Sequence, residues 1–144
     1  RILRPLDDLE MEVRAKEAID RLQVNTLRSV RAKVGGLSGG QRQAIAIARA
    51  VGSDGSVVML DEPTAALGVA QTRQVLDVVK RLRDTNHAVI YISHNMRDIF
   101  EVADRICVLR HGSNVATWRK EDITPDEIVA AMTRGLDDET GNAA

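Results

Sequence analysis

The stretch LSGGQ at positions 37–41 has the composition of a phosphate-binding turn. Ser38, Gly39, Gly40 and Gln41 precede an alanine- and isoleucine-rich run typical of a helix. Two glycines at a helix start let backbone N–H groups approach an anion, and the helix dipole adds positive potential. Ser38 and Gln41 also have the spacing of a capping box, so an ordinary capped helix is the structural alternative.

A second candidate site lies twenty residues further on, where Asp61 and Glu62 follow the apolar run 57–60. If that run is a buried parallel strand, both carboxylates lie at the strand end where open α/β sheets bind ligands. One carboxylate could bind Mg²⁺ while the other orients a water molecule, and phosphoryl transfer to water needs both roles. On the Asp-Glu pair alone, a simple cap of the following turn is the preferred interpretation.

Hydrophobic periodicity predicts the helices that position these residues. Apolar residues at helical spacing indicate a helix over 8–22, with Asp7 or Asp8 as its cap, and others over 38–52 and 75–82. A short helix is expected over 96–103. Thr124, Pro125 and Glu127 supply a cap, a first-turn proline and a capping-box partner for a last helix that ends near Gly135.

Two unbroken apolar runs predict strands. The runs 57–60 and 88–92 are typical of strands covered on both faces, and strand, helix, strand forms a parallel crossover unit. The segments 105–110 and 115–119 predict a hairpin with a turn at 111–114. The sequence therefore predicts an α/β fold with a parallel-sheet core.

The composition excludes several classes of protein. With 144 residues, 44% of them hydrophobic, the chain suits one domain or a piece of one. Its net charge of −1 gives no electrostatic footprint for nucleic acid. No apolar stretch approaches the roughly 20 residues that span a bilayer. Cys107, the only cysteine, is expected to be a buried small apolar residue.

The motifs occur in an order that resembles the nucleotide-binding domain of ABC ATPases, from about Asp8 to Trp118. LSGGQ is similar to the family signature, VVMLDE to the Walker B strand, and Ser93-His94 to the switch histidine that follows the next strand. The segment EPTAALGV, with Gly68 where the family usually has aspartate, resembles bacterial importers of monosaccharides such as ribose, xylose and fructose. By itself His94 is more typical of a structural hydrogen bond.

The resemblance implies a role for each candidate residue. Asp61 would bind Mg²⁺ through its shell, Glu62 would polarise the attacking water, and His94 would contact the γ-phosphate. Ser38, Gly39, Gly40 and Gln41 are the residues that would contact the phosphates of ATP held by another protomer. His87 is expected to be a helix-end or turn residue, and His111 a hairpin-turn residue.

One family motif is absent from the sequence. No G-x-x-x-x-G-K-[ST] occurs, and in the family this Walker A motif precedes the region that the chain resembles. The expected fold is therefore the C-terminal part of a P-loop NTPase (RecA-like) ABC cassette. Residues 1–52 would end the helical signature subdomain, 53–135 would form the C-terminal part of the ATPase core, and 136–144 a polar tail. The chain alone is predicted to be inactive.

The function implied by the resemblance is that of an importer subunit. It would couple hydrolysis of ATP, with Mg²⁺, to uptake of a simple sugar, at the cytoplasmic face of the plasma membrane. Its partners would be a second nucleotide-binding domain, a membrane permease and, indirectly, a periplasmic sugar-binding protein, but no nucleic acid. Two alternatives remain: a soluble ABC ATPase that acts on DNA or ribosomes, and an inactive truncated cassette.

Overall fold

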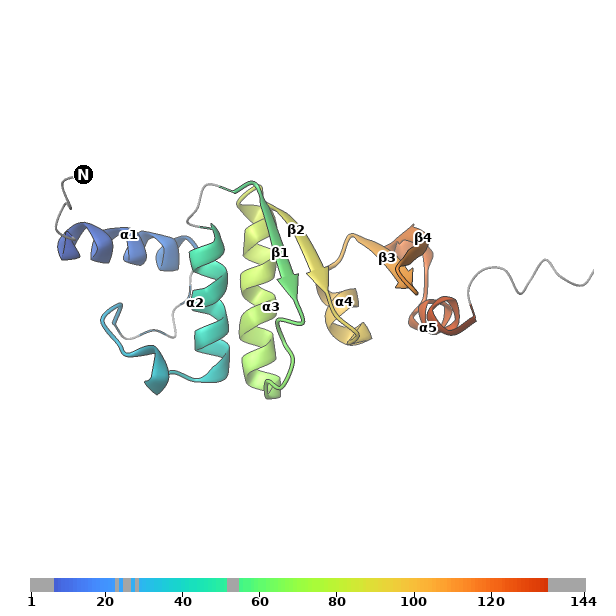
Figure 1. Cartoon of the computed structure of the whole chain (residues 1–144), viewed down its shortest axis with the longest axis horizontal. Coiled ribbons are helices and arrows are strands. Elements are labelled where there is room, and N and C mark those ends of the chain that lie inside the picture. Colours follow the sequence, from blue (N-terminus) through green and yellow to red (C-terminus); the bar gives the residue numbers. More distant parts are fainter. Residues whose placement is uncertain (1–6, 23, 25–26, 28, 52–54, 135–144) are drawn as a thin grey trace, which may run out of the picture. The chain divides into compact units, whose positions relative to one another are not determined.

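The chain folds into two compact units, Arg1–Ile92 and Ser93–Ala144. The computed structural model describes residues 7–22, 24, 27, 29–51 and 55–134, and Figure 1 labels the helices and strands of both units. The predicted tail at 136–144 lies outside the described residues. A division after Ile92 does not test the predicted subdomain boundary at residue 52, which stays a prediction.

The helices of the first unit form where capping residues and apolar spacing predict them. They are α1 (Asp8–Arg21), the short 3₁₀ helix η1 (Val34–Gly36), α2 (Gly39–Val51) and α3 (Val69–Asp84). Helix α1 begins at Asp8 because the Asp7 carboxylate accepts hydrogen bonds from the backbone N–H groups of Leu9, at 3.1 Å, and Glu10, at 3.0 Å. The predictions for 8–22 and 38–52 are confirmed, and α3 extends beyond the predicted 75–82.

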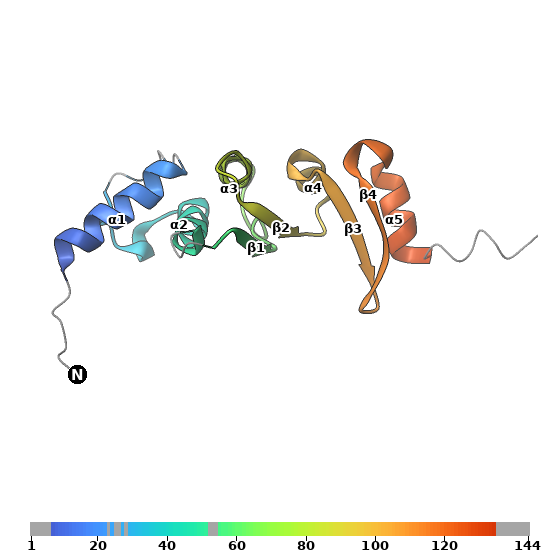
Figure 2. The same cartoon turned by 90° about the horizontal axis from the view of Figure 1, so that it is seen from above.

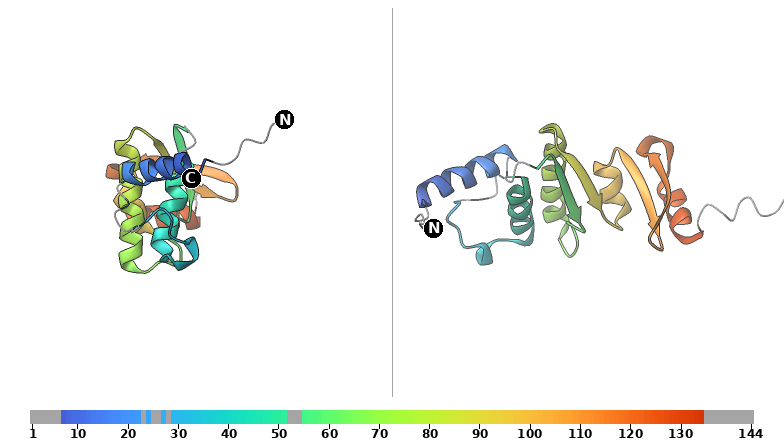
Figure 3. Two further views of the ribbon diagram at one scale, coloured as in Figure 1. Left: turned by 90° about the vertical axis from the view of Figure 1, so that its left-hand side faces the viewer. Right: turned by 45° about the horizontal axis from the view of Figure 1, so that its top comes forward.

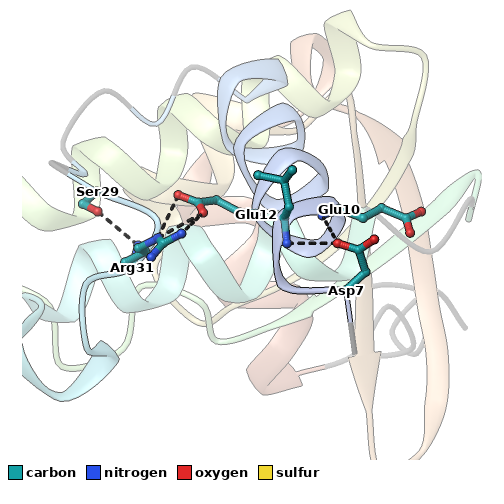
Figure 4. Close-up of polar contacts among 6 residues, drawn as sticks. Asp7, Glu10, Glu12, Ser29 and Arg31 are labelled. Atoms are coloured by element: carbon teal, nitrogen blue, oxygen red, sulfur yellow. Dashed lines mark hydrogen bonds and ion pairs between the residues drawn. The ribbon is translucent and has the colours of Figure 1, made fainter. Parts of the chain in front are cut away.

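An ion pair joins α1 to the irregular segment that precedes the LSGGQ stretch. The Arg31 guanidinium donates to both carboxylate oxygens of Glu12, with a shortest distance of 2.6 Å, and the Ser29 hydroxyl accepts from the backbone N–H of Arg31 (Figure 4). Hydrogen bonding to and attraction by Arg31 lower the pKa of the Glu12 carboxyl, and Glu12 in turn raises the pKa of Arg31. Because the Arg31 side chain is mostly exposed, the pair adds little stability.

The first unit contains a two-stranded parallel sheet. Strand β1 (Val57–Asp61) pairs with β2 (Ala88–Ile92) in a register that sets Val57 beside Ala88 and Asp61 beside Ile92. Helix α3 connects the two strands and packs on one side of them, and α2 packs on α3 (Figure 2). The buried apolar side chains of α3 and α2 are Val75, Leu76, Val78, Val79 and Leu82, with Ala44, Ile47 and Ala48. The predicted parallel crossover unit is confirmed.

Among the described residues of the first unit, only one face of this sheet is covered. Val58 and Leu60 point to the α3 side and are 3% and 6% exposed. The alternate residues point the other way, and their exposed fractions are 56% for Val57, 66% for Met59, 46% for Ile90 and 44% for Ile92. The prediction of strands covered on both faces is therefore wrong for the described residues of the first unit, because none of its described elements lies on the second face.

The second unit contains an antiparallel hairpin between helices. Its elements are α4 (Met96–Val102), β3 (Arg105–Arg110), β4 (Ser113–Arg119), the 3₁₀ turn η2 (Lys120–Asp122) and α5 (Pro125–Arg134), as Figure 3 shows. His111 and Gly112 make the hairpin turn with φ values of 49° and 78°, as a type I′ turn requires. The predicted hairpin and the predicted helices at 96–103 and from Thr124 are confirmed.

One face of the hairpin carries the core of the second unit. Its buried residues are Ile106, Val108, Ile123, Ile128 and Ala131, and side chains of α4, including Phe100, pack against them. Cys107 lies on the other face and is exposed, so the prediction of a buried cysteine is wrong. The reason is the alternation of β3, which turns Ile106 and Val108 inward and their neighbour Cys107 outward. Among the described residues, no helix is both long and apolar enough to cross a membrane.

Candidate functional site

The two carboxylates lie where the sequence predicts, at the C-terminal end of a parallel strand. Asp61 is the last residue of β1 and is exposed. By the alternation of the strand it shares its face with Val57 and Met59, the face that no described element covers. Its carboxylate is therefore open to a ligand on that side of the sheet.

Glu62 does not continue the strand. Its φ of 45° is in the left-handed region, which is unfavourable for a residue with a Cβ. The backbone N–H of Glu62 donates to the Ile92 carbonyl at 2.9 Å, and its own carbonyl accepts from the N–H of Ala65 at 3.1 Å. Glu62 therefore lies in a tight turn after β1, and this turn sets the direction of its side chain.

The LSGGQ stretch forms the predicted capped start of α2. The side chain of Gln41 accepts from the Ser38 N–H at 2.9 Å, and the Ser38 hydroxyl accepts from the Gln41 N–H at 3.3 Å. The Ser38 carbonyl accepts the first helical hydrogen bond, from Arg42. The structure therefore confirms the capping box, and contact of Ser38, Gly39, Gly40 and Gln41 with phosphate stays a prediction.

The two glycines of this stretch also have a packing role that the sequence pattern did not indicate. A Cβ on Gly39 would lie 2.9 Å from Cδ2 of Leu67, and one on Gly40 would lie 3.0 Å from Cβ and 3.2 Å from Cα of Gln71. Gly40 is buried. The start of α2 thus contacts the end of the loop that begins with Glu62, and the glycines permit this close approach.

That loop ends at Gly68, the residue that stands where the resemblance predicts aspartate. The backbone N–H of Gly68 donates to the side-chain carbonyl of Gln71 at 3.2 Å. The side chain of Gln71, the third residue of α3, therefore accepts the hydrogen bond that caps the start of this helix, in place of an acidic cap. The described structure brings the LSGGQ stretch and the carboxylate loop together in one unit.

His94 lies in the second unit, in the turn between β2 and α4. It is exposed, and its neighbours order the turn: the Ser93 hydroxyl accepts from the Asn95 N–H at 3.1 Å, and the Asn95 side chain accepts from the N–H of Arg97 at 3.1 Å. The predicted position after a strand is confirmed, whereas the predicted γ-phosphate contact stays a prediction. His87 follows the end of α3, where its backbone N–H donates to the Leu82 carbonyl and its Nδ1 lies 3.0 Å from the Thr85 hydroxyl. His111 is a hairpin-turn residue as expected.

The acidic residues of the described chain do not form a metal site by themselves. No group of three or more His, Cys, Asp or Glu side chains among the described residues could hold a metal ion. Mg²⁺ commonly binds through one or two carboxylates and completes its shell with water and phosphate oxygens. The exposed carboxylate of Asp61 fits this kind of site, in which a nucleotide supplies the remaining ligands.

A cavity of about 340 Å³ lies away from the candidate residues. It is found near the N-terminal ends of β1 and β2, whereas Asp61 ends β1. It is lined by Arg21, Leu22, Val51, Gly55, Ser56, Thr85, Asn86 and His87.

Comparison with known proteins gives a family match over part of the chain and alignments over most of it. Residues 3–65, which include LSGGQ, Asp61 and Glu62, match the family model described as ABC transporter. The chain is 42% identical over 130 residues to a fructose import ATP-binding protein of Rhizobium meliloti, covering 90% of this chain and 50% of that protein. This chain is related to the ATP-binding proteins of ABC transporters. A xylose/arabinose import ATP-binding protein of Sulfolobus acidocaldarius is 41% identical over 128 residues, 89% of this chain and 51% of that protein.

The fold agrees with this relationship. An ABC transporter solved in an inward-facing conformation matches with a TM-score of 0.74 at 27% identity, over 92% of this chain and 52% of that one. A nucleotide-free ATP-binding cassette from an ABC transporter has a TM-score of 0.70 at 23% identity, over 88% of this chain and 47% of that one. The predicted fold, part of an ABC cassette with a parallel-sheet core, is confirmed. The chain spans about half the length of the fructose and xylose/arabinose import ATP-binding proteins that it matches.

Proposed function

We propose that this chain supplies the signature and Walker B parts of an ATPase subunit in an ABC importer of simple sugars. The observation that carries the proposal is its identity of 41–42% to sugar import ATP-binding proteins, over an alignment of 128–130 residues. A ribose import ATP-binding protein of Bacillus licheniformis is also 39% identical over 127 residues, 88% of this chain and 25% of that protein. The three relatives are named for fructose, xylose/arabinose and ribose, and this agreement supports the class of substrate, a monosaccharide.

The roles of the site residues follow from the positions that the motifs occupy. Asp61 binds Mg²⁺ from the open face of the sheet, and Glu62 orients the attacking water. His94 contacts the γ-phosphate. Ser38 and Gly39 begin α2, a helix of 13 residues, where backbone N–H groups favour an anion; with Gly40 and Gln41 they act on ATP held by a second nucleotide-binding domain.

The exposed apolar face of the β1–β2 sheet supports the proposal that these residues form part of a cassette. The sequence contains no Walker A motif, and the relatives are about twice as long as the matched region. We propose that polypeptide corresponding to the rest of the relatives covers Val57, Met59, Ile90 and Ile92 and supplies the phosphate-binding lysine. Without it, the 144 residues hydrolyse no ATP. The working assembly is a dimer of such subunits on a permease, at the cytoplasmic face of the membrane, with the sugar-binding protein acting through the permease.

Replacing Glu62 by Gln tests the catalytic assignment. In the native protein that carries these residues, Glu62→Gln is expected to abolish hydrolysis of Mg-ATP while ATP binding, measured by equilibrium titration, is retained. The matched control is Glu121→Gln, the same chemical change at a surface carboxylate that pairs with exposed Arg119 at 2.6 Å. Retained hydrolysis in Glu62→Gln, or an equal loss in the control, would refute the assignment.

Uptake measurements test the transport role. Cells that lack the native protein are expected to lose uptake of a monosaccharide of the fructose, xylose or ribose kind, and the Glu62→Gln variant is expected not to restore it. Co-purification with ribosomes or DNA, together with unchanged sugar uptake, would instead favour the soluble ABC ATPase.

A further inference from the structure

The loop that carries Glu62 is held by two consecutive residues of β2. The Ile92 carbonyl accepts from the backbone N–H of Glu62 at 2.9 Å. One residue earlier, the Tyr91 hydroxyl lies 3.2 Å from the hydroxyl of Thr64. Both contacts lie within the first unit, and together they join the first three residues after β1 to the end of the neighbouring strand.

The loop needs such support because its backbone is unfavourable. Glu62 and Ala66 both have positive φ, 45° and 58°, a conformation that side chains with a Cβ rarely adopt without support from their surroundings. A turn of this kind persists when neighbouring contacts determine it. Thr64, which lies between these two residues, is 8% exposed, so its hydrogen bond is formed away from bulk water.

Tyr91 reaches Thr64 because the two strands are in register. Tyr91 pairs with Leu60 and shares its face of the sheet, the side on which α3 packs. Asp61 points to the opposite face. The Thr64–Tyr91 contact therefore braces the carboxylate loop from the covered side and leaves the open side, where the nucleotide is proposed to bind, unobstructed.

We propose that the hydrogen bond between Thr64 and Tyr91 is a positioning contact for Glu62 in ATP hydrolysis, an inference that rests on the proposed function. Neither side chain is assigned to contact nucleotide. Their effect is to hold the turn so that the Glu62 carboxylate has one direction relative to Asp61. Orientation of the attacking water by Glu62 contributes to the transition state and not to the binding of ATP. A loosened turn is therefore expected to lower kcat and to leave the KM for ATP unchanged.

A set of matched variants in the native protein separates this role from packing. Thr64→Val keeps the shape of the side chain and removes its hydroxyl, whereas Thr64→Ser keeps the hydroxyl and removes the methyl group. Tyr91→Phe removes only the partner oxygen. Thr64→Val and Tyr91→Phe are each expected to lower kcat by about three- to ten-fold, the range of one lost hydrogen bond. The double variant is expected to be no slower than the slower single one, and Thr64→Ser is expected to stay close to the unmutated protein.

The outcomes distinguish the inference from the proposed function. Unchanged kcat in both Thr64→Val and Tyr91→Phe, or a loss in Thr64→Ser as large as in Thr64→Val, would overturn the positioning role alone. Absence of hydrolysis by the unmutated protein would refute the proposed function and the positioning role with it. Thermal melting of each variant controls for folding; if Thr64→Val fails to fold, Tyr91→Phe, which alters a half-buried side chain, decides the question.

Discussion

The two sheets of this chain have the same number of strands but different outer surfaces. Residues of β1 and β2 that point away from α3 are almost all apolar: Val57, Met59, Ala88, Ile90 and Ile92, with Asp61 at the end. Residues of β3 and β4 that point away from their core are mostly polar, namely Arg105, Thr117 and Arg119, with Cys107 and Leu109. The outer face of the β1–β2 sheet is thus apolar and exposed, and we call it the unfinished face. The outer face of the β3–β4 hairpin is mostly polar, as is usual for a face in contact with water.

This difference follows from strand direction. Parallel sheets occur almost only with both faces covered, whereas an antiparallel hairpin is stable with one face in water. The parallel pair therefore needs a second layer that the described residues do not supply. The difference also coincides with the proposed chemistry, because Asp61 lies on the unfinished face and no predicted site residue lies on the hairpin.

The largest expected effect tests whether only one face of the parallel sheet stabilises the chain. Leu60→Ala removes a side chain that is 6% exposed and is expected to lower the free energy of unfolding by about 2–5 kcal/mol. Met59→Ala, one residue away on the 66% exposed face, is expected to change it by less than about 0.5 kcal/mol. Denaturant unfolding of the 144-residue chain measures both values. Equal losses would show that the second face is covered in solution.

The elements of both sheets could be predicted from the sequence because their signals are local. Asp7, Ser38 and Thr124 cap helices through hydrogen bonds to groups two or three residues away, and unbroken apolar runs mark strands. The exposure of Met59 could not be predicted in this way. An apolar run shows that a strand is suited to burial on both faces, but it contains no information on whether the covering layer belongs to the same chain.

The candidate site also has features that the sequence predicts and features that it does not. The positions of Asp61, Glu62 and His94 at strand ends follow from the order of the motifs. Other features of the site depend on contacts between residues that are far apart in the sequence. The hydrogen bond between Thr64 and Tyr91 joins residues 27 positions apart, and the contact of Gly40 with Gln71 depends on the packing of α2 on α3. The left-handed φ of Glu62 likewise has no local signal in the sequence. The sequence indicates phosphate access or a helix cap for the signature glycines, but sequence spacing does not reveal which helix packs on them.

A smaller effect is expected for the packing of α2 on α3 in the first unit. Gly40→Ala places a Cβ 3.0 Å from Cβ of Gln71 and 3.2 Å from its backbone Cα, so α2 and α3 must move apart, at a cost of about 1–3 kcal/mol. Gly35→Ala is the matched control, since nothing lies within 4 Å of its added Cβ. Thermal melting without nucleotide is the measurement. A melting temperature of Gly40→Ala equal to that of the control would show that the packing of α2 on α3 does not require this glycine.

A third prediction concerns association instead of folding. Met59→Lys puts a charge in the middle of the apolar face and is expected to increase the monomer fraction of the 144-residue chain, because exposed apolar patches promote self-association. Leu109→Lys, at a 68% exposed residue of the hairpin, is expected to change it little, since the surrounding face is already polar. Sedimentation velocity measures the monomer fraction. An equal response of both variants would remove the contrast between the two sheets.

The smallest effect compares one carboxylate in each unit under acid. Hydrogen bonds from the Thr124 hydroxyl and backbone N–H lower the pKa of Glu127, and Arg31 lowers that of Glu12. A lowered folded-state pKa means that each contribution is complete above the pKa of an unfolded glutamate, about 4.3, and is lost as the pH falls through the folded value. Glu12→Gln and Glu127→Gln should therefore each flatten the decrease in melting temperature below that pH. Because Arg31 is charged and Thr124 is neutral, added salt should weaken the effect of Glu12 and leave that of Glu127 nearly unchanged. Equal salt sensitivity of the two variants would contradict this assignment of causes.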